Sequence, residues 1–312
     1  MTAILHPSTG NPVPEPHQSG FFTGHDGVRL RYAVFPATAE PKGTVVLVHG
    51  RSEFIEKYFE TIRDLTAQGF AVATYDLRGQ GLSDRPLKNR LLGHVNRFAD
   101  YERDLALFID QIVRPACPAP LHLLGHSTGG LIVLSAAPAL VGRISRMVLS
   151  APFVGLHGEA LSQGKVFALT RFLSMIGLGS LPMGTSGKSA EFATNPLTTD
   201  EARYQRNTGF FASLPDLALG APTARWLSEC GKAIARVRTR SHLSLITMPT
   251  LLIAPQEDGV VPFKAQQTLV RDFSTCRLLP IPGARHEVLQ EKEALRQQAL
   301  KAMLDFLREA HA

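Results

Sequence analysis

The sequence predicts an α/β fold in which a mostly parallel, doubly wound sheet carries a helical insertion. Short apolar runs that suit buried parallel strands alternate with segments of helical spacing from Thr44 to Ala151. This alternation stops at Pro152, and until about Ser241 the chain has helical stretches without a convincing strand. It resumes with the apolar run 250–254. We therefore expect one layered core with a cap inserted between two of its strands.

The first element expected is an antiparallel hairpin over residues 20–35, where apolar and polar residues alternate after the turn 25–27. The buried parallel strands are expected at residues 44–48, 70–75, 121–124, 146–151, 250–254 and 277–281. The helices are expected at residues 56–68, 98–113, 131–137, 263–272 and 291–310. Two of them are ended by helix-stopping residues, Gly69 and Pro115. Parallel strands joined in this way place helices on both faces of the sheet.

Shifts in composition divide the chain into three parts. Residues 1–20 are rich in Pro, Ser and His, which is typical of a flexible or loosely packed arm. Residues 21–152 and 241–312 carry the strand–helix alternation and are expected to form the core. Residues 153–240 are expected to form a helical cap over the carboxyl edge of the sheet, where ligands of α/β proteins bind.

The net charge of +6 is concentrated in the expected cap, where Lys and Arg outnumber Asp and Glu. A positive field of this kind suits an anionic membrane surface or a phosphate-bearing substrate. It is equally typical of a solvated face that keeps a protein in solution, and both interpretations stay open. The basic residues are not interleaved with aromatic ones, so we expect no nucleic-acid binding.

No pattern in the sequence indicates a metal or a cofactor. The three cysteines, Cys117, Cys230 and Cys276, are scattered without a C-x-x-C pair, and the histidines are dispersed without an H-E-x-x-H motif. The first residues lack the apolar segment of a signal peptide, and no run of about 18 apolar residues follows. We expect a cytoplasmic protein, with loose peripheral contact at the inner membrane surface left open.

The candidate nucleophile is Ser127, in the pattern Gly125-His126-Ser127-Thr128-Gly129 between an apolar strand and a helix. A strand that turns sharply into a helix exposes the serine hydroxyl at the sheet edge. Glycines two residues on either side avoid collisions of a Cβ with the neighbouring elements. The bare motif is common, but its strand–turn–helix context favours a nucleophile over an ordinary turn serine.

The candidate base and acid follow the nucleophile along the chain in the order Ser, Asp, His. Asp258 and His286 each come directly after one of the last two expected strands, on the same sheet edge as Ser127. A serine hydroxyl needs a base to remove its proton, and the imidazole needs a carboxylate to fix its tautomer. Glu257 is adjacent to Asp258 and stays open as the alternative acid.

The expected oxyanion donors are two backbone N–H groups. One belongs to Arg51, after the first buried strand, and the other to Thr128, at the start of the helix behind the nucleophile. The Arg51 side chain stays open as a contact to a lid or to a substrate phosphate. The Gly-rich loop 76–84 lacks the Lys-Ser/Thr of a P-loop, so we interpret it as a tight turn that shapes one wall of the site.

Together these motifs resemble the α/β-hydrolase superfamily, and more narrowly its branch of monoacylglycerol lipases and bacterial lysophospholipases of the L2 group. The narrower resemblance rests on the stretches 50–58, 195–200, 203–206 and 217–227. It implies a triad of Ser127, Asp258 and His286 under a cap that admits an acyl chain. The stretch 50–52, Gly-Arg-Ser, departs from the Gly-Gly-Gly loop of lipases that act on large esters, which argues against a triacylglycerol substrate.

The ordered triad predicts a serine hydrolase that cleaves the acyl ester of a lysophospholipid or monoacylglycerol through an acyl-enzyme. The alternative is a small-ester, thioester or amide hydrolase on the same triad. A remote alternative, a non-catalytic binding protein, predicts a degraded triad. The helical stretch 161–178 would line an acyl tunnel, touch a membrane or simply pack onto the core. Its broad apolar face comprises Leu161, Val166, Leu169, Phe172, Leu173 and Ile176.

Overall fold

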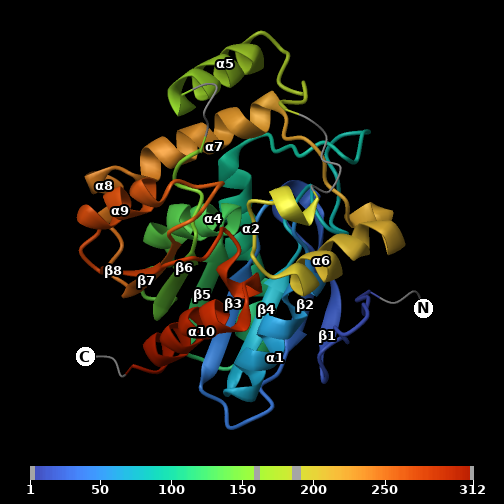
Figure 1. Ribbon diagram of the computed structural model, residues 1–312, viewed down its shortest axis with the longest axis vertical. Helices are drawn as coiled ribbons and strands as arrows, with labels where there is room; N and C mark the ends of the chain where they lie inside the picture. The colour runs from blue at the N-terminus through green and yellow to red at the C-terminus, as the bar shows by residue number, and fades with distance from the viewer. Residues whose placement is uncertain (1–3, 158–161, 185–190, 310–312) are drawn as a thin grey trace.

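A computed structural model describes residues 4–157, 162–184 and 191–309 (Figure 1). At its centre lies one 8-stranded sheet with the order β1-β2-β4-β3-β5-β6-β7-β8. The strands are β1 (Gln18–Thr23), β2 (Arg29–Phe35), β3 (Gly43–Val48), β4 (Phe70–Tyr75), β5 (Leu121–His126), β6 (Arg146–Ser150), β7 (Thr250–Pro255) and β8 (Cys276–Ile281). β2 pairs antiparallel with both β1 and β4, and all the other neighbours pair in parallel. The predicted hairpin and mostly parallel sheet are confirmed.

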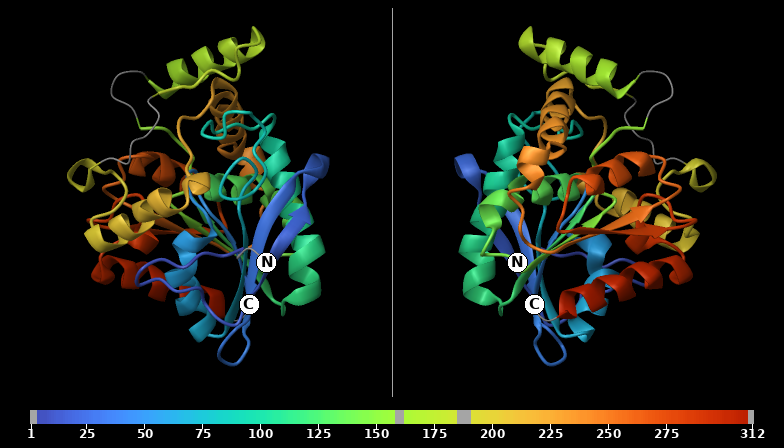
Figure 2. Two further views of the ribbon diagram at one scale, coloured as in Figure 1. Left: turned by 90° about the vertical axis from the view of Figure 1, so that its right-hand side faces the viewer. Right: turned by 90° about the vertical axis from the view of Figure 1, so that its left-hand side faces the viewer.

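Helices cover both faces of this sheet (Figure 2). They are α1 (Phe59–Ala67), α2 (Phe98–Phe108), α3 (Arg114–Ala116), α4 (Thr128–Ala136), α5 (Gln163–Met175), α6 (Glu201–Ser213), α7 (Ala224–Val237), α8 (Arg240–Leu243), α9 (Phe263–Arg271) and α10 (Glu293–Arg308). One apolar layer joins the sheet to α1 and α10, through side chains such as Ile62 and Met303. The other joins it to α2 and α4, through Leu105 and Ile132. The doubly wound α/β class predicted from the sequence is therefore confirmed.

Two predicted helices differ from their expected limits. The stretch 56–68 begins with a 3₁₀ turn, Ile55–Tyr58, and becomes α-helical only from Phe59. The stretch 98–113 forms α2, a π turn over Ile109–Val113 and then α3. Pro115 has no N–H with which to continue an α-helical ladder, so the hydrogen-bond register changes in the turn before it.

The described part of the N-terminal segment packs against the core instead of forming the loosely packed arm expected from its composition. Leu5 is buried among the apolar side chains around α1 and α10. The Asn11 Nδ2 group donates to the carbonyl oxygen of Glu56 at 3.1 Å, and the carbonyl of Ile4 accepts from Arg31 at 2.9 Å. A few specific contacts hold this segment against the core, and such contacts cannot be predicted from amino-acid composition.

The insertion folds as helices α5, α6 and α7, and its described residues contain no β-strand. Helix α7 packs on α2 and α4 of the core. Helix α5 lies on the outer side of α7, at the top of Figure 1, whereas α6 lies lower, beside the core. The cap therefore has two arms that extend from one basal helix.

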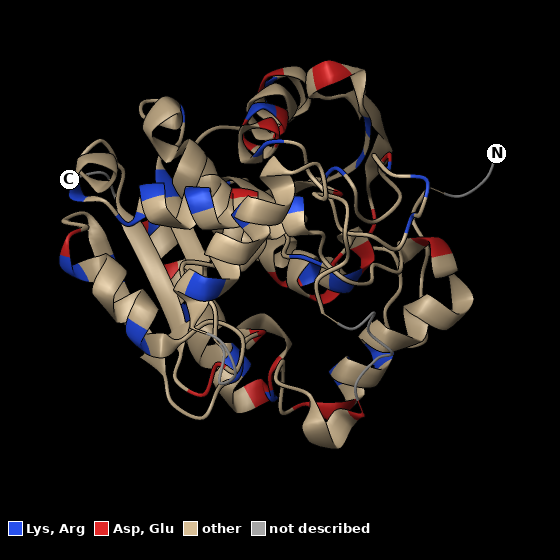
Figure 3. Ribbon diagram, turned by 90° about the horizontal axis from the view of Figure 1, so that it is seen from above, with Lys and Arg blue, Asp and Glu red and all other residues tan. Residues whose placement is uncertain are grey.

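The charges of the molecule are mixed in sign. Figure 3, which looks down on the cap, shows Lys and Arg as well as Asp and Glu distributed over the helices. Among the described helices, none combines the length and the hydrophobicity needed to cross a bilayer.

Candidate active site

Ser127 occupies a sharp turn between β5 and α4. Its φ of 50° and ψ of −116° lie in a region that residues other than glycine rarely adopt. A Cβ on Gly129 would lie 2.0 Å from the carbonyl oxygen of Val48, and a Cβ on Gly125 would lie 2.8 Å from the Cα of Gly130. Only glycine fits these two positions, which is the steric reason for the sequence motif.

The three side chains predicted as a triad meet at the carboxyl edge of the sheet. His286 Nε2 lies 2.9 Å from Ser127 Oγ, and His286 Nδ1 lies 2.8 Å from Asp258 Oδ2. The other carboxylate oxygen of Asp258 accepts two backbone N–H groups of its own loop, each at 2.8 Å. Glu257, the alternative acid, is exposed to solvent. With its Nδ1–H donated to Asp258, the imidazole presents Nε2 as an acceptor for the serine proton.

The loop after β3 passes directly beside the nucleophile. A Cβ on Gly50 would lie 3.1 Å from Ser127 Cβ. The N–H of Gly50 donates to the carboxylate of Glu53, and the N–H of Ser52 donates to Gln80 Oε1 at 2.7 Å. These bonds hold the backbone on either side of Arg51.

The two predicted oxyanion donors are the N–H groups of Arg51 and Thr128. Neither N–H has a protein acceptor among the residues described, although both neighbours of Arg51 have one. Thr128 is the first residue of α4, so its N–H also carries the positive end of the helix dipole. Both groups are open to a negative oxygen, and their role in holding one stays a prediction.

The loop 76–84 braces the loop after β3 from behind. Asp76 accepts the N–H of Ile55 at 3.1 Å and pairs with the buried Arg31 at 2.7 Å. The Asp76 carboxylate is turned inward to these groups. None of the residues 76–84 is among those that line the cavity beside Ser127. Our expectation that the loop 76–84 shapes a wall of the site is wrong. It supports the loop after β3, and that loop lines the cavity.

A buried ionic cluster connects the two loops that flank Ser127, the candidate nucleophile. Lys57 Nζ lies 2.7 Å from Glu53 Oε1 and 2.6 Å from Glu287 Oε1, and Tyr58 OH donates to Glu53 Oε2 at 2.7 Å. Burial by itself would lower the pKa of Lys57, but the two carboxylates outweigh it and raise the pKa. Lys57 thus stays cationic and joins the loop after β3 to the residue that follows His286.

His126 contributes a second imidazole to the site. Its ring centroid lies 5.0 Å from that of His286. Burial lowers the pKa of His126 to about 4, although Glu53, 3.6 Å away, opposes the change. His126 is therefore neutral at pH 7 and places no second positive charge beside His286.

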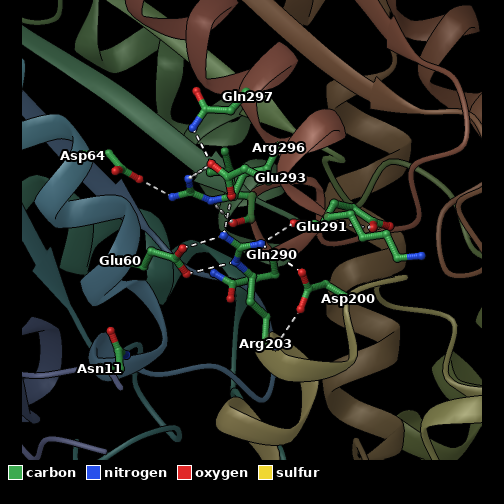
Figure 4. A network of polar contacts seen from close by, with 12 residues as sticks. Asn11, Glu60, Asp64, Asp200, Arg203, Gln290, Glu291, Glu293, Arg296 and Gln297 are labelled. Carbon is green, nitrogen blue, oxygen red and sulfur yellow. Dashed lines mark hydrogen bonds and ion pairs between the residues drawn. The ribbon is translucent and has the colours of Figure 1, made fainter. Parts of the chain in front are cut away.

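The cap is fastened to the loop that carries His286 by a polar network between α6, α1 and α10 (Figure 4). Arg203 donates to both carboxylate oxygens of Glu60, at 3.0 and 2.6 Å, and to Glu293 at 2.6 Å. It also donates to the backbone carbonyl of Glu291 at 2.9 Å. The cap side of the site is thus held by charge-assisted bonds to the core.

A cavity of about 490 Å³ opens at Ser127 and His286. Most of its wall is apolar, with Phe54, Phe153, Leu156, Phe211, Leu219 and Trp226 among its side chains. The polar side chains of Asn207 and Thr208 also line it. A cavity of this size and polarity suits a ligand with an apolar chain and a small polar end.

Helix α5 does not line this cavity, so the predicted acyl-tunnel role of the stretch 161–178 is not met. Its buried side chains are Thr170 and Ser174, whereas Leu169, Phe172 and Ile176 are exposed. Both buried hydroxyls donate to carbonyls one turn earlier in the helix, which satisfies them against α7. These three side chains therefore point away from the core, whereas Val166 of the same predicted face packs against it. Leu161 of the predicted face lies outside the described residues.

Sequence reasoning named the three side chains that the structure brings together, Ser127, Asp258 and His286, and missed the ionic cluster. Glu53 and Lys57 are four residues apart, a spacing that usually marks an exposed pair on a helix. The available signal was the position of Glu287 next to the candidate base, together with Glu53 and Lys57 in the segment that follows the buried strand 44–48.

Several known proteins are similar to this chain over most of its length. Lysophospholipase L2 of Escherichia coli K12 is 34% identical over 300 residues, which cover 91% of this chain and 86% of that protein. A monoacylglycerol lipase of Mycolicibacterium smegmatis is 28% identical over 274 residues, 87% of this chain and 91% of that protein.

Among solved structures, a soluble variant of monoglyceride lipase from Saccharomyces cerevisiae aligns with a TM-score of 0.75 at 21% identity. The alignment covers 94% of this chain and 96% of that one. At this identity the match shows the fold, which is that of an α/β hydrolase. The family model described as "Serine aminopeptidase, S33" matches residues 39–293. With this match over most of its length, the chain belongs to the S33 serine aminopeptidase family of α/β hydrolases.

Proposed function

We propose that this protein is a serine hydrolase that cleaves the acyl ester of a lysophospholipid or monoacylglycerol. The observation that carries the proposal is the continuous chain of contacts from Asp258 through His286 to Ser127, beside a mostly apolar cavity. The relatives named lysophospholipase and monoacylglycerol lipase support the choice of a lipid ester.

In the proposed mechanism Ser127 Oγ attacks the ester carbonyl carbon while its proton passes to His286 Nε2. The N–H groups of Arg51 and Thr128 hold the negative oxygen of the tetrahedral intermediate. Asp258 orients the imidazole and stabilises its protonated form. When the intermediate collapses, His286 returns the proton to the leaving alcohol, and the acyl chain stays on the serine. Water then repeats the sequence and releases the fatty acid.

The family description raises an amide substrate as the second candidate. An aminopeptidase needs a carboxylate to bind the positive amino group of its substrate. The carboxylates that line this cavity, Glu53 and Glu287, are both bound to Lys57. An apolar wall with no free carboxylate among the residues described favours an acyl chain.

The outward face of α5 supports contact with an anionic lipid surface, which we propose as the way the enzyme approaches its substrate. Phe172 and Met175 are 54% and 69% exposed. The helix carries the exposed cations Lys165 and Arg171 and no acidic residue. Apolar side chains with flanking cations match the acyl boundary and the negative headgroups of such a surface.

The proposed function is tested by fatty-acid release from lysophosphatidylcholine, a monoacylglycerol of the same chain and a short p-nitrophenyl ester. In Ser127→Ala we expect each activity to fall by more than about 10³-fold, because the nucleophile is lost. Ser244→Ala removes an exposed serine and serves as the matched control. Activity that survives Ser127→Ala contradicts the proposal. Turnover of the short ester alone would leave the chemistry intact and overturn the lipid assignment.

A further inference from the structure

Arg51 is half-buried and places a guanidinium without an acidic partner at the wall of the cavity that holds Ser127. Its Nη2 donates to the carbonyl oxygen of Gly220, and its Nη1 donates to Ser52 Oγ at 3.3 Å. Its Nε is buried and has no acceptor among the described residues. A guanidinium offers five N–H donors, so these two bonds leave most of its capacity unused.

The groups around this guanidinium are neutral. Its carbon lies 5.4 Å from the ring centroid of Trp226. The ionisable groups that act on it are Tyr101 and Cys230, and burial raises the pKa of both, so neither is negative at pH 7. Burial lowers the pKa of Arg51 to about 10, which still leaves it cationic at that pH.

Lys57 also lines the cavity but, unlike Arg51, has acidic partners. Lys57 lies between two carboxylates, at 2.7 and 2.6 Å, whereas no carboxylate lies within 4.0 Å of the Arg51 guanidinium among the residues described. An unpaired charge that is partly withdrawn from water is costly, and an anion that binds beside it offsets this cost. An anionic group on a ligand would therefore be stabilised beside Arg51.

The position of Arg51 limits where that anion sits on a substrate. The backbone N–H of the same residue is the proposed donor to the ester oxyanion, so the guanidinium lies within one side-chain length of the reacting carbonyl. In a lysophospholipid the phosphate is separated from the ester by the glycerol backbone, which is a comparable length. Arginine is well suited to phosphate oxygens because its planar fork donates in pairs.

We propose that the Arg51 side chain binds the phosphate oxyanion of the substrate, so that the enzyme prefers a lysophospholipid to a monoacylglycerol with the same acyl chain. This inference rests on the proposed function and selects between its two substrates. It makes Arg51 a specificity-determining residue through its side chain, in addition to the role proposed for its backbone.

The test compares kcat/KM for lysophosphatidylcholine and for the matching monoacylglycerol, in the same detergent micelles, for wild type and Arg51→Gln. The measured quantity is the ratio of the two values, because any general damage to the loop lowers both and cancels. We expect the ratio to fall by about tenfold or more, the effect of losing a hydrogen bond to a charged group. Arg51→Lys keeps the charge and should restore part of the ratio.

The matched control is Arg85→Gln. Arg85 also has a pKa lowered to about 10 by burial, and it donates to the carbonyl of Asp216 at 2.9 Å, but it does not line the cavity. We expect its ratio to equal that of wild type. If Arg85→Gln changes the ratio as much as Arg51→Gln does, the effect comes from the position of the cap and the proposal is overturned.

A measurement on the wild type keeps the proposal testable even if the variants do not fold. Glycerophosphocholine should inhibit hydrolysis of the p-nitrophenyl ester competitively, and glycerol at the same ionic strength should not. Inorganic phosphate serves as a further arm, and inhibition by it alone points to a free phosphate site and overturns substrate recognition. An unchanged ratio in Arg51→Gln also overturns the proposal. These outcomes presuppose ester hydrolysis, so they are distinct from failure of the proposed function, in which activity is absent or survives Ser127→Ala.

Discussion

Helices α5 and α6 both belong to the cap and both pack partly through apolar side chains, but of the two only α6 forms salt bridges among the described residues. Helix α6 turns charged side chains toward the core, where Arg203 and Arg206 both bind Glu60. Helix α5 packs on α7 through Phe167 as well as through the small polar Thr170 and Ser174. It leaves Leu169, Phe172 and Met175 exposed. Among the described residues, no salt bridge involves α5.

The contacts of α5 and α6 differ because the two helices lie beside different parts of the molecule. The segment before α6 bonds to the loop that carries the proposed base, His286. The N–H of Glu287 donates to the carbonyl of Leu197, and Thr198 Oγ1 donates to that of Gln290, both at 2.8 Å. Polar bonds have defined directions, so they fix the position of that loop. The apolar face of α5 has no such direction and suits a partner as irregular as a lipid surface. The polar contacts around α6 hold the His286 loop in position, whereas the exposed apolar side chains of α5 are available to a partner.

The largest effect is expected when the polar contacts between α6 and the core are removed. Arg203→Ala removes the bonds to Glu60, Glu293 and the carbonyl of Glu291. We expect the free energy of unfolding to fall by about 2 kcal/mol. Turnover of a short soluble ester should fall by about tenfold, since the loop that carries His286 loses its support. Urea unfolding and ester kinetics measure the two effects.

The matched control for that variant is Arg171→Ala on α5. Arg171 is exposed and forms no ion pair with another described residue, so both quantities should stay at the wild-type value. If the two arginine variants behave alike, the network does not hold the site and the contrast between the arms is wrong.

The next effect concerns the exposed arm alone. Phe172→Asp should reduce binding to phosphatidylglycerol vesicles by about tenfold, because burying an aromatic ring contributes about 1.5–3 kcal/mol and the new charge is repelled. Turnover of the soluble ester and the urea midpoint should not change. Co-sedimentation with vesicles provides the measurement. The control is Leu245→Asp, which alters a leucine that is 59% exposed outside the cap. An equal loss in both variants would show that general surface hydrophobicity, not α5, determines binding.

The same contrast explains which parts of the molecule could be predicted from the sequence. The sheet, its helices and the positions of Ser127, Asp258 and His286 follow from strand periodicity and from the rule that loops after parallel strands share an edge. These inferences need only local pattern and chain order. Their outcome does not depend on how the insertion packs.

What could not be predicted depends on contacts between distant segments. Apolar spacing identified a face on α5, but it does not tell which side chains become buried, and here the buried ones are Thr170 and Ser174. Lys57 and Glu287 are 230 residues apart, so no local pattern pairs them. Arg203 likewise meets Glu60 across 143 residues. Paired charges of this kind resemble ordinary surface residues until the fold brings them together.

The smallest effect expected is a pH dependence of the free energy of unfolding, which arises from the pairing of Glu60 with α6. Partial burial would raise the pKa of Glu60, but hydrogen bonds from Arg203 and Arg206 outweigh it and lower the pKa from 4.5 to about 2. A lowered folded-state pKa contributes stability that is complete above the unfolded value and is lost as the pH falls toward the folded one. The contribution of Glu60 should therefore disappear between about pH 5 and pH 2.

Glu60→Gln isolates this contribution. Urea unfolding at pH 7 should find the variant less stable than wild type, because the neutral amide pairs less strongly with the two arginines. The difference should shrink as the pH falls from about 5 and be nearly gone near pH 2, where wild-type Glu60 is itself protonated. The partial exposure of the pair keeps the effect modest. Because α5 has no acidic side chain, Phe172→Leu should lower stability equally, if at all, at every pH. A difference for Glu60→Gln that is equally independent of pH would mean that Arg203 and Arg206 position the carboxyl group without stabilising its charge.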